Sequence, residues 1–421
     1  MKILFLSGHY PPDIHGGFEI GAMQIAEGLH ARGHDITVLT TCSKYKSQHK
    51  KRYSVKRILP SSSVGSNFLP IIFLVRFFRE ILSYIRLTKF LKNQKFDLIY
   101  VWTPDTLFNS AFQVLEQQEI PTVYYFFDTW FSKQEKLCNH NFFNDLSRFS
   151  FIKKKLLKCY SIFHVDPLFE CHFKQVQYCS SVIENTFHRR FSYAVNGKTI
   201  LFGIDTSLYN FIPGRKLKKP INILFMGGTW KHKGIHIALS AVKKLHDWGY
   251  PILFHIYGGF DKKQKLLLQR LVEHRKMADY VIRYGLVDHS DLIKGISEHD
   301  ILIFSSVWNE PYGLVPLEAM AAGAVVVSTG DGGSRDYSHD GGNCLLYSPF
   351  SSLDCANKIK MLIDSPDLYQ QLRKQARAFV ETKMQLSSTI DQIEQDLLQT
   401  IRTSGECNFN SPEQLHSAVK Q

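Results

Sequence analysis

Strand-length apolar runs that alternate with helical stripes constrain this chain more than any other feature. Before residue 130, Val, Ile, Tyr and Phe dominate four such runs, at residues 2–8, 34–41, 96–102 and 121–128. Between the first two, residues 16–34 carry apolar side chains at helical spacing, and Gly33 ends the pattern. This alternation predicts a doubly wound parallel α/β sheet.

The same pattern restarts after about residue 218. Further apolar runs of strand length alternate with helical patterns, at residues 221–228, 251–259, 280–287, 300–306 and 324–330. Residues 203–220 are polar, basic and interrupted by Gly and Pro, as is typical of an inter-domain linker. One last helical pattern covers about 352–401, before a polar tail. The sequence thus predicts two Rossmann-like domains at 1–202 and 221–380, the linker at 203–220, and a C-terminal helix with a mobile tail at 381–421.

Composition limits the classes of partner. The chain has 421 residues and a formal net charge of +13, which favours an anionic partner. We expect no nucleic acid, because no zinc-finger or RNP-type signature accompanies the charge. The eight cysteines show no C-x-x-C spacing, and reduced thiols in a cytoplasmic protein are the simplest interpretation. The N-terminal apolar run is too short for a signal peptide, and no transmembrane helix is expected.

The stretch EPYGLVPLEAMAAG, residues 310–323, places two carboxylates where apolar packing is expected. Glu310 follows a buried strand, so it belongs to the ligand-binding edge of the sheet. Glu318 lies in the first turns of the next helix, where Leu314 and Val315 offer backbone N–H groups to an anion. Donors for phosphate beside acceptors for hydroxyls suit a nucleotide sugar. The alternative is that Glu318 caps its own helix and Glu310 is solvated.

Several further stretches occur in the order and spacing of one enzyme family. They are GGFEIGAMQIAEGLHARGHDITVLT, FGIDTSLY, FMGGTWKHKGIHIALSAVKKL, YGLVDHSDL, DILIFSSVWNEPYG and TGDGGSRDYSHDGGNCLLYSP. Together with the Glu310–Glu318 spacing, they resemble retaining glycosyltransferases of family 4 over most of residues 1–380. The resemblance implies the GT-B fold, with an acceptor-binding domain at 1–202 and a nucleotide-sugar-binding domain at 221–380.

The resemblance also implies residue roles in the donor site. Lys233 would hold the donor diphosphate, Glu318 the ribose hydroxyls and Glu310 the transferred sugar. Alternatively, Lys233 is a surface lysine. Main-chain contacts to the donor are implied for seven residues, namely Gly16, Gly17, Gly285, Leu286, Gly313, Leu314 and Val315. We further expect Gly16 and Gly17 to permit a close approach to the sugar phosphate, although a simple turn is the alternative.

The chain departs from the family pattern at two places. Gly228 stands where the family usually has Arg, and Lys231 is a candidate replacement, with His232 as a further candidate. Phe127-Asp128 stands where the family often has His-Asp. Asp128 is therefore a candidate catalytic contact to a sugar hydroxyl, or else a structural cap.

These features predict transfer of a sugar from a nucleotide-diphosphate sugar to a glycan or lipid-linked acceptor, with retention. Lys233 and helix N-termini would stabilise the leaving diphosphate, so we expect no required metal and no further cofactor. The alternatives are a GT-B epimerase or phosphorylase, and a non-catalytic nucleotide-sugar-binding protein.

Residues 67–95 predict an amphipathic helix with a strongly basic polar face, begun by Pro70. Such a helix can lie in a membrane interface that contains anionic lipids. The alternative is a helix packed on the N-terminal sheet with its charges in water. The first interpretation predicts a cytoplasmic enzyme bound peripherally to the inner face of the cytoplasmic membrane.

Overall fold

The computed structural model describes most of the chain. The described residues are 1–14, 16–43, 52–62, 69–102, 104, 106–130, 150–167, 169–193, 195–227, 232–259 and 261–409, with backbone alone for 69–73, 150–153, 156 and 405–409. They form two compact units. The first comprises Met1–Cys179, Ile183–Ile200 and, from the C-terminal end, Ile390 onward; the second comprises Ser180–Val182 and Leu201–Thr389.

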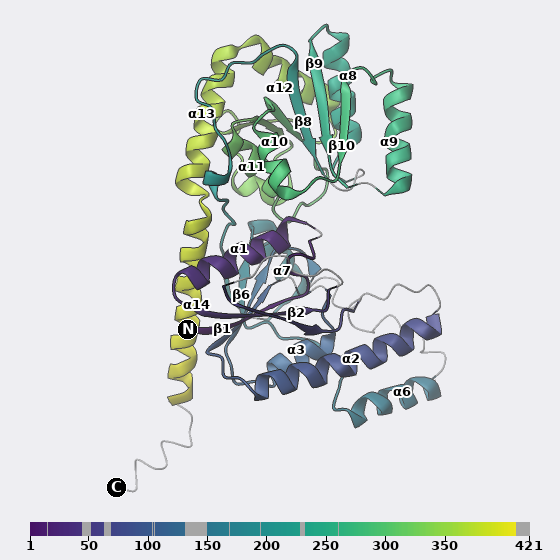
Figure 1. Ribbon diagram of the computed structural model, residues 1–421, viewed down its shortest axis with the longest axis vertical. Coiled ribbons are helices and arrows are strands. Elements are labelled where there is room, and N and C mark those ends of the chain that lie inside the picture. The colour runs from purple at the N-terminus through teal and green to yellow at the C-terminus, as the bar shows by residue number, and fades with distance from the viewer. Residues whose placement is uncertain are drawn as a thin grey trace. The chain divides into compact units, whose positions relative to one another are not determined.

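The first unit contains a parallel sheet of seven strands in the order β3-β2-β1-β4-β5-β6-β7 (Figure 1). The strands are β1 (Lys2–Ser7), β2 (Asp35–Thr41), β3 (Ser54–Leu59), β4 (Leu98–Trp102), β5 (Thr122–Phe126), β6 (Gln175–Tyr178) and β7 (Asn196–Thr199). Its central strands β1 and β4 are buried along nearly their whole length. Continuous apolar runs form such strands because helices cover both faces of a parallel sheet.

Helices lie on both faces of this first sheet. Figure 1 shows α1 on one side of β1 and β2, and α2 with α3 on the other side. The helices are α1 (Gly17–Ala31), α2 (Leu69–Lys92), α3 (Asn109–Glu116), α6 (Ser150–Ile162) and α7 (Ser181–Arg190). The predicted amphipathic helix at 67–95 is therefore present, as α2.

The second unit contains a parallel sheet of six strands in the order β10-β9-β8-β11-β12-β13. The strands are β8 (Ile221–Met226), β9 (Ile252–Tyr257), β10 (Val281–Gly285), β11 (Ile301–Phe304), β12 (Val325–Ser328) and β13 (Cys344–Leu346). Two parallel sheets in an α/β chain confirm the predicted fold class. The sequence analysis did not predict four of the strands, β3, β6, β7 and β13.

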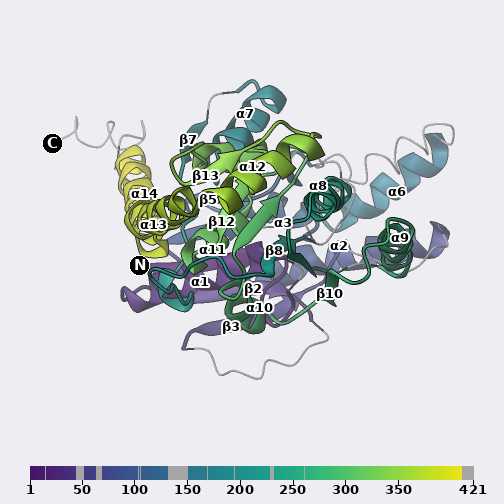
Figure 2. The same ribbon diagram turned by 90° about the horizontal axis from the view of Figure 1, so that it is seen from above.

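Helices cover both faces of the second sheet as well. Figure 2 shows α8 and α12 on one side of β8 and β12, with α10 and α11 on the other. The elements are η3 (Thr206–Leu208), α8 (Ile235–Asp247), α9 (Lys262–His274), α10 (His289–Ile296), α11 (Leu314–Ala322), η4 (Gly332–Asp336), α12 (Ser352–Asp364) and α13 (Pro366–Lys383). The main core of this unit lies between the sheet and α8, α9, α12 and the start of α13.

The C-terminal region differs from the single helical pattern expected over about 352–401. Three helices occupy it, α12, α13 and α14 (Leu386–Phe409). Pro366 is the first residue of α13, where its missing N–H costs nothing, so α12 ends before it. Residues 203–220, which we interpret as a linker, group with the second unit, and Ile204 forms a β-bridge with Gln385. The predicted mobile tail beyond residue 409 lies outside the described residues.

Candidate functional site

The candidate site of the second unit lies at the switch point of its sheet. The chain runs from β8 outward through β9 and β10, and then returns to β11 on the other side of β8. The loops that follow β8 and β11 therefore leave the sheet side by side in opposite directions. Ligands of doubly wound folds bind at this crevice, outside the carboxyl ends of the strands.

Lys233 and Glu310, one from each of these loops, form an ion pair. Lys233 Nζ donates to both carboxylate oxygens of Glu310, at 2.7 Å and 2.6 Å. Glu310 is 7% exposed, so it is buried and not solvated. The Lys233 side chain is 23% exposed, which excludes the alternative of a freely solvated surface lysine.

Two side chains that the sequence analysis missed complete the shell around Glu310. Its Oε2 accepts hydrogen bonds from Ser306 Oγ at 3.0 Å and from Trp308 Nε1 at 2.9 Å. Both residues precede Glu310 in the same loop, and the side chains of both can donate a hydrogen bond. A charged carboxylate in so buried a place needs such donors, because desolvation otherwise penalises it heavily.

Close backbone contacts fix the position of Lys233. The next residue, Gly234, has φ +70° and begins α8; a Cβ there would lie 1.9 Å from the carbonyl oxygen of Ser305. Ser305 Oγ also donates to the carbonyls of Lys233 and Gly234, at 3.0 Å each. Only glycine lets the two loops approach this closely.

A glycine pair supports Glu310 from its other side. A Cβ on Gly332 would lie 2.4 Å from the backbone nitrogen of Glu310, and one on Gly333 would lie 2.2 Å from the carbonyl oxygen of Pro311. Gly333 N–H donates to the Glu310 carbonyl at 2.7 Å. Glycine is therefore required at both positions of η4, because Gly332 and Gly333 pack directly against the Glu310 loop.

Helix α11 presents its N-terminus and Glu318 next to this loop. The helix starts at Leu314 after Gly313, whose φ is +85°, so the N–H groups of Leu314 and Val315 have no acceptor within the helix. Glu318 is 8% exposed. It accepts a hydrogen bond from Tyr209 Oη at 3.2 Å and approaches His289 Nε2 at 3.5 Å. It therefore does not cap its own helix.

Tyr209 and His289 were also missed by the sequence analysis. Burial raises the pKa of the Tyr209 hydroxyl, and the charge of Glu318 raises it further. The hydroxyl therefore remains protonated and donates to Glu318. Neither residue falls within the Glu310–Gly323 stretch, and only the fold brings them to it.

Gly285 and Leu286 lie at the end of β10. Gly285 has φ +78°, and the side chain of Leu286 is 84% exposed. Beside them Tyr257 and Tyr284 stack, with ring centroids 4.2 Å apart. His289, which contacts Glu318, follows Leu286 by three residues, so this strand end connects directly to the Glu318 environment.

The remaining candidates belong to the first unit. Gly16 precedes α1, and its N–H donates to Glu19 Oε2 at 2.8 Å. Its φ is −165°, which any residue adopts, so a need for glycine at this position would come from a close contact and not from the backbone conformation. Gly17 is the first residue of α1. Asp128 accepts from Thr129 N at 2.5 Å, a local contact of the kind that a structural cap makes.

The chain departs from the family pattern at Gly228 and at Phe127. Gly228 and Lys231 lie outside the described residues. Phe127 is 8% exposed and packs beside Trp102 and Tyr125, so an aromatic side chain suits its position in the core.

Within the described part of the chain, no group of three or more His, Cys, Asp or Glu residues is arranged to hold a metal ion.

Two family models match successive parts of the sequence. The model described as Glycosyltransferase Family 4 matches residues 15–206, and that described as Glycosyl transferases group 1 matches residues 210–379. The chain belongs to glycosyltransferase family 4. It is accordingly a glycosyltransferase, and dependence on a nucleotide sugar is typical of the family. Retention of the anomeric configuration is consistent with it.

Curated relatives agree with this assignment. Glycogen synthase from Mycobacterium tuberculosis is 24% identical over 396 residues, which cover 90% of this chain and 89% of the relative. Alpha-D-kanosaminyltransferase from Streptomyces kanamyceticus is 26% identical over 175 residues, covering 42% of this chain and 44% of that protein.

Solved structures confirm the GT-B fold. Sucrose-phosphate synthase from Thermosynechococcus elongatus aligns with a TM-score of 0.71 at 18% identity, covering 96% of this chain and 99% of that one. HepE from Anabaena in complex with UDP aligns with a TM-score of 0.70 at 19% identity, covering 95% and 100%.

Gly234 offers a direct test of the close approach between the loops. Gly234→Ala places a methyl group against the Ser305 carbonyl, whereas Gly341→Ala has the same φ of +70° but meets nothing within 4 Å. Alanine at this φ costs about 1–2 kcal/mol in either place. The clash should cost Gly234→Ala roughly 1–3 kcal/mol more. Urea unfolding of both variants measures the difference, and equal losses would contradict the described packing.

Proposed function

We propose that this protein is a retaining hexosyltransferase that uses a nucleotide-diphosphate sugar and acts on a glycan or lipid-linked acceptor. The Lys233–Glu310 ion pair at the sheet's switch point carries the proposal. A cation held by a buried carboxylate, beside the N-terminus of α11, supplies positive charge where a diphosphate can reach it. The complex of HepE with UDP-glucose and the glycogen synthase relative support a nucleotide-sugar donor of this kind.

The site residues divide the donor between them. Lys233 contacts the diphosphate and, with the first N–H groups of α11, stabilises the charge that grows on the leaving group. Glu310 contacts the transferred sugar, whose transition state is cationic. Glu318, with one donor from Tyr209, accepts from the ribose hydroxyls. We propose that Lys233 neutralises the diphosphate without a required divalent metal, because an ammonium group can replace that charge.

The other GT-B functions remain alternatives. An epimerase would form product from the donor alone, and a phosphorylase would require free phosphate. A non-catalytic binding protein, suggested by Gly228 and Phe127, would bind nucleotide but show no turnover. The two glycosyltransferase family models that match the chain favour the transferase over these alternatives.

A nucleotide panel tests the donor site. Melting temperatures are measured with UDP, GDP, ADP and their common sugar conjugates. A ligand at about 100 times its dissociation constant adds about 2.7 kcal/mol to the free energy of unfolding. We expect the nucleotides of one base to raise the melting temperature. The variants Lys233→Ala and Glu318→Gln should abolish that increase.

Lys263→Ala is the matched control, because Lys263 is exposed on α9 of the same unit. It should retain the full increase. An absence of any increase with the whole panel would contradict the donor-site assignment. A normal increase in Lys233→Ala would contradict the role of that lysine alone.

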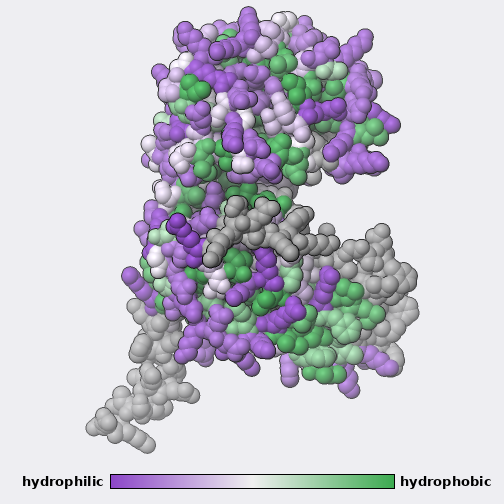
Figure 3. Space-filling view, in the orientation of Figure 1, coloured by the Kyte–Doolittle hydropathy of each residue, from purple (hydrophilic) through white to green (hydrophobic). Residues whose placement is uncertain are grey.

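We also propose that α2 attaches the enzyme to an anionic membrane surface. Four apolar side chains recur along one stripe of this helix, and all are exposed: Leu74 (54%), Phe78 (65%), Leu82 (37%) and Ile85 (47%). Figure 3 shows apolar side chains gathered over this part of the first unit. Arg86, Lys89 and Lys92 follow on the same helix and are exposed. Exposed apolar side chains next to cations suit a bilayer interface with anionic lipids.

The opposite faces of α2 pack inward, as the alternative interpretation of this helix expected. Ile81 joins Tyr160 and Val165 in a small buried cluster, and Glu80 accepts a hydrogen bond from Tyr160 Oη at 3.2 Å. No helix among the described residues is long and apolar enough to span a membrane. We propose that the α2 stripe makes this attachment at the inner face of the cytoplasmic membrane.

Vesicle sedimentation tests this attachment. We expect the double variant Leu74→Gln, Phe78→Gln to bind vesicles of phosphatidylglycerol and phosphatidylcholine at least about tenfold more weakly. The reason is that it loses apolar area that the bilayer would bury. Leu353→Gln on α12 removes an equally exposed leucine (52%) and should bind like the unaltered protein. Unchanged binding of the double variant, or no binding of the unaltered protein at low salt, would contradict the proposal.

A further inference from the structure

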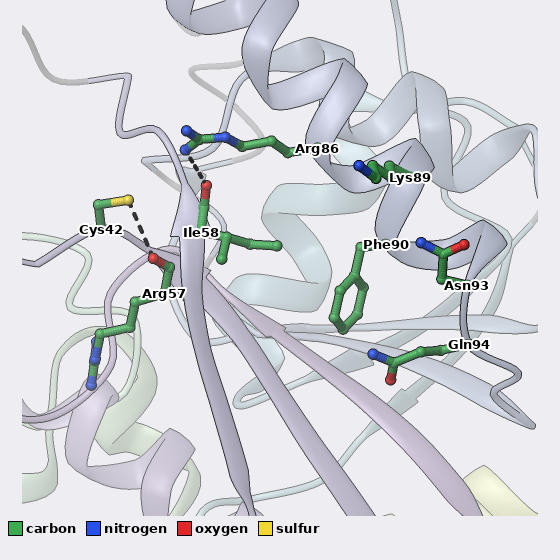
Figure 4. A pocket seen from close by; sticks show the side chains of 8 residues that line it. All are labelled: Cys42, Arg57, Ile58, Arg86, Lys89, Phe90, Asn93 and Gln94. Atoms are coloured by element: carbon green, nitrogen blue, oxygen red, sulfur yellow. Dashed lines mark hydrogen bonds between the residues drawn. The ribbon is translucent and has the colours of Figure 1, made fainter.

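A cavity of about 590 Å³ lies in the first unit between the edge strand β3 and the C-terminal half of α2 (Figure 4). It is distinct from the donor site, which belongs to the second unit. The lining residues that matter here are Ile58, Arg86, Lys89, Phe90, Asn93 and Gln94. The proposed donor site uses none of them.

The polar wall of the cavity supplies cations and amides. Arg86, Lys89 and Asn93 are spaced by three and four residues, so they share one face of α2 and its end. None of the described residues that line the cavity is a carboxylate. Phe90 and Ile58 add an apolar surface between the helix and the strand (Figure 4). This combination suits a ligand that is anionic at one end and apolar at the other.

Arg86 is already positioned for such a ligand. Its Nη1 donates to the carbonyl of Ile58 at 2.7 Å, which holds the guanidinium at the rim of the cavity. The remaining N–H groups of a guanidinium can bind phosphate in a bidentate manner. The Arg57 guanidinium is not assigned to the ligand, because it donates to the carbonyls of Tyr10 and Pro11, at 3.2 Å and 2.5 Å.

We propose that this cavity binds the phosphate-bearing head of an anionic membrane lipid. The proposal rests on the membrane attachment proposed above, because the exposed stripe that ends at Ile85 leads along α2 to Arg86 and Lys89. A lipid with its chains in the bilayer next to the stripe can place its phosphate between these two cations. The lipid's first apolar atoms then contact Phe90 and Ile58.

Cys42 provides a natural reporter of occupancy. Its thiol is exposed, lines the cavity and donates to the carbonyl of Arg57 at 3.3 Å. The rate of alkylation at Cys42 is followed by peptide mass spectrometry, so that the other cysteines do not interfere. The probes are dihexanoyl phosphatidic acid below its micelle concentration, dihexanoyl phosphatidylcholine and inorganic phosphate.

Lys89→Gln and Lys92→Gln form a matched pair, because both remove one exposed charge from the last turns of α2 and only Lys89 lines the cavity. We expect phosphatidic acid to slow Cys42 alkylation severalfold. Lys89→Gln should raise the half-saturating concentration about tenfold, as loss of a charge-assisted contact does. Lys92→Gln should change it by less than about twofold, as for a surface charge. Equal melting temperatures establish that both variants are folded.

Three results would overturn the assignment. Equal effects of the two lysine variants would indicate diffuse electrostatic attraction and no cavity site. Equal protection by inorganic phosphate would assign a free-anion site instead of a lipid site. Equal protection by phosphatidylcholine would show that the cations are not used. Because the probes are monomeric, Leu74→Gln, Phe78→Gln should still bind them, so failure of membrane attachment is distinguishable from failure of the cavity site.

Discussion

The buried carboxylate of Glu310 is the constraint on which the arrangement of the second unit's site depends. A carboxylate at 7% exposure is stable only with donors around it. Lys233, Ser306 and Trp308 supply them from two loops of neighbouring strands. The loops must then lie close together, which explains Gly234 against Ser305 and Gly332 against Glu310. The local glycine pattern follows from the need to hold this charge.

We propose that the Lys233–Glu310 ion pair also prepares Lys233 for the donor diphosphate. Both oxygens of Glu310 accept from Lys233. A diphosphate carries more negative charge than one carboxylate, so it can attract Lys233 while Ser306 and Trp308 keep Glu310 in place. Glu310 then has an oxygen available for the transferred sugar. Glu310 thus holds Lys233 in place before the diphosphate binds, which reduces the entropic cost of binding.

The sequence predicted the strands that are continuous apolar runs and missed four strands that are short or polar. Strands such as β1 and β4 are continuous apolar runs because helices cover both faces. In contrast β7, the exposed edge strand Asn196–Thr199, reads NGKT and carries no apolar signal. β13 has only three residues. Its pairing with β12, which no local pattern encodes, defines it as a strand.

The same division applies to the site. Glu318 was identified because a carboxylate is unusual in an apolar helix, and Glu310 because it follows a buried strand. The role of Lys233 was implied by the family resemblance. Tyr209 and His289 were not identified, because their role depends on contacts with Glu318 across 109 and 29 residues of chain. The close approach to a sugar phosphate expected at Gly16 and Gly17 stays a prediction, because it depends on a ligand contact and not on the backbone conformation. Asp128 makes a local contact with Thr129, and its proposed catalytic role stays a prediction.

We propose that Lys233 exchanges Glu310 for the donor diphosphate. Calorimetric titration of the preferred nucleoside diphosphate into Lys233→Gln and Glu310→Gln tests this exchange. We expect Lys233→Gln to lose affinity for the nucleoside diphosphate. Glu310→Gln should bind it at least as tightly as the unaltered protein, because its lysine is released, yet should fail to transfer sugar. Equal losses of affinity in the two variants would contradict the exchange, since the pair would then act as one fixed structural unit.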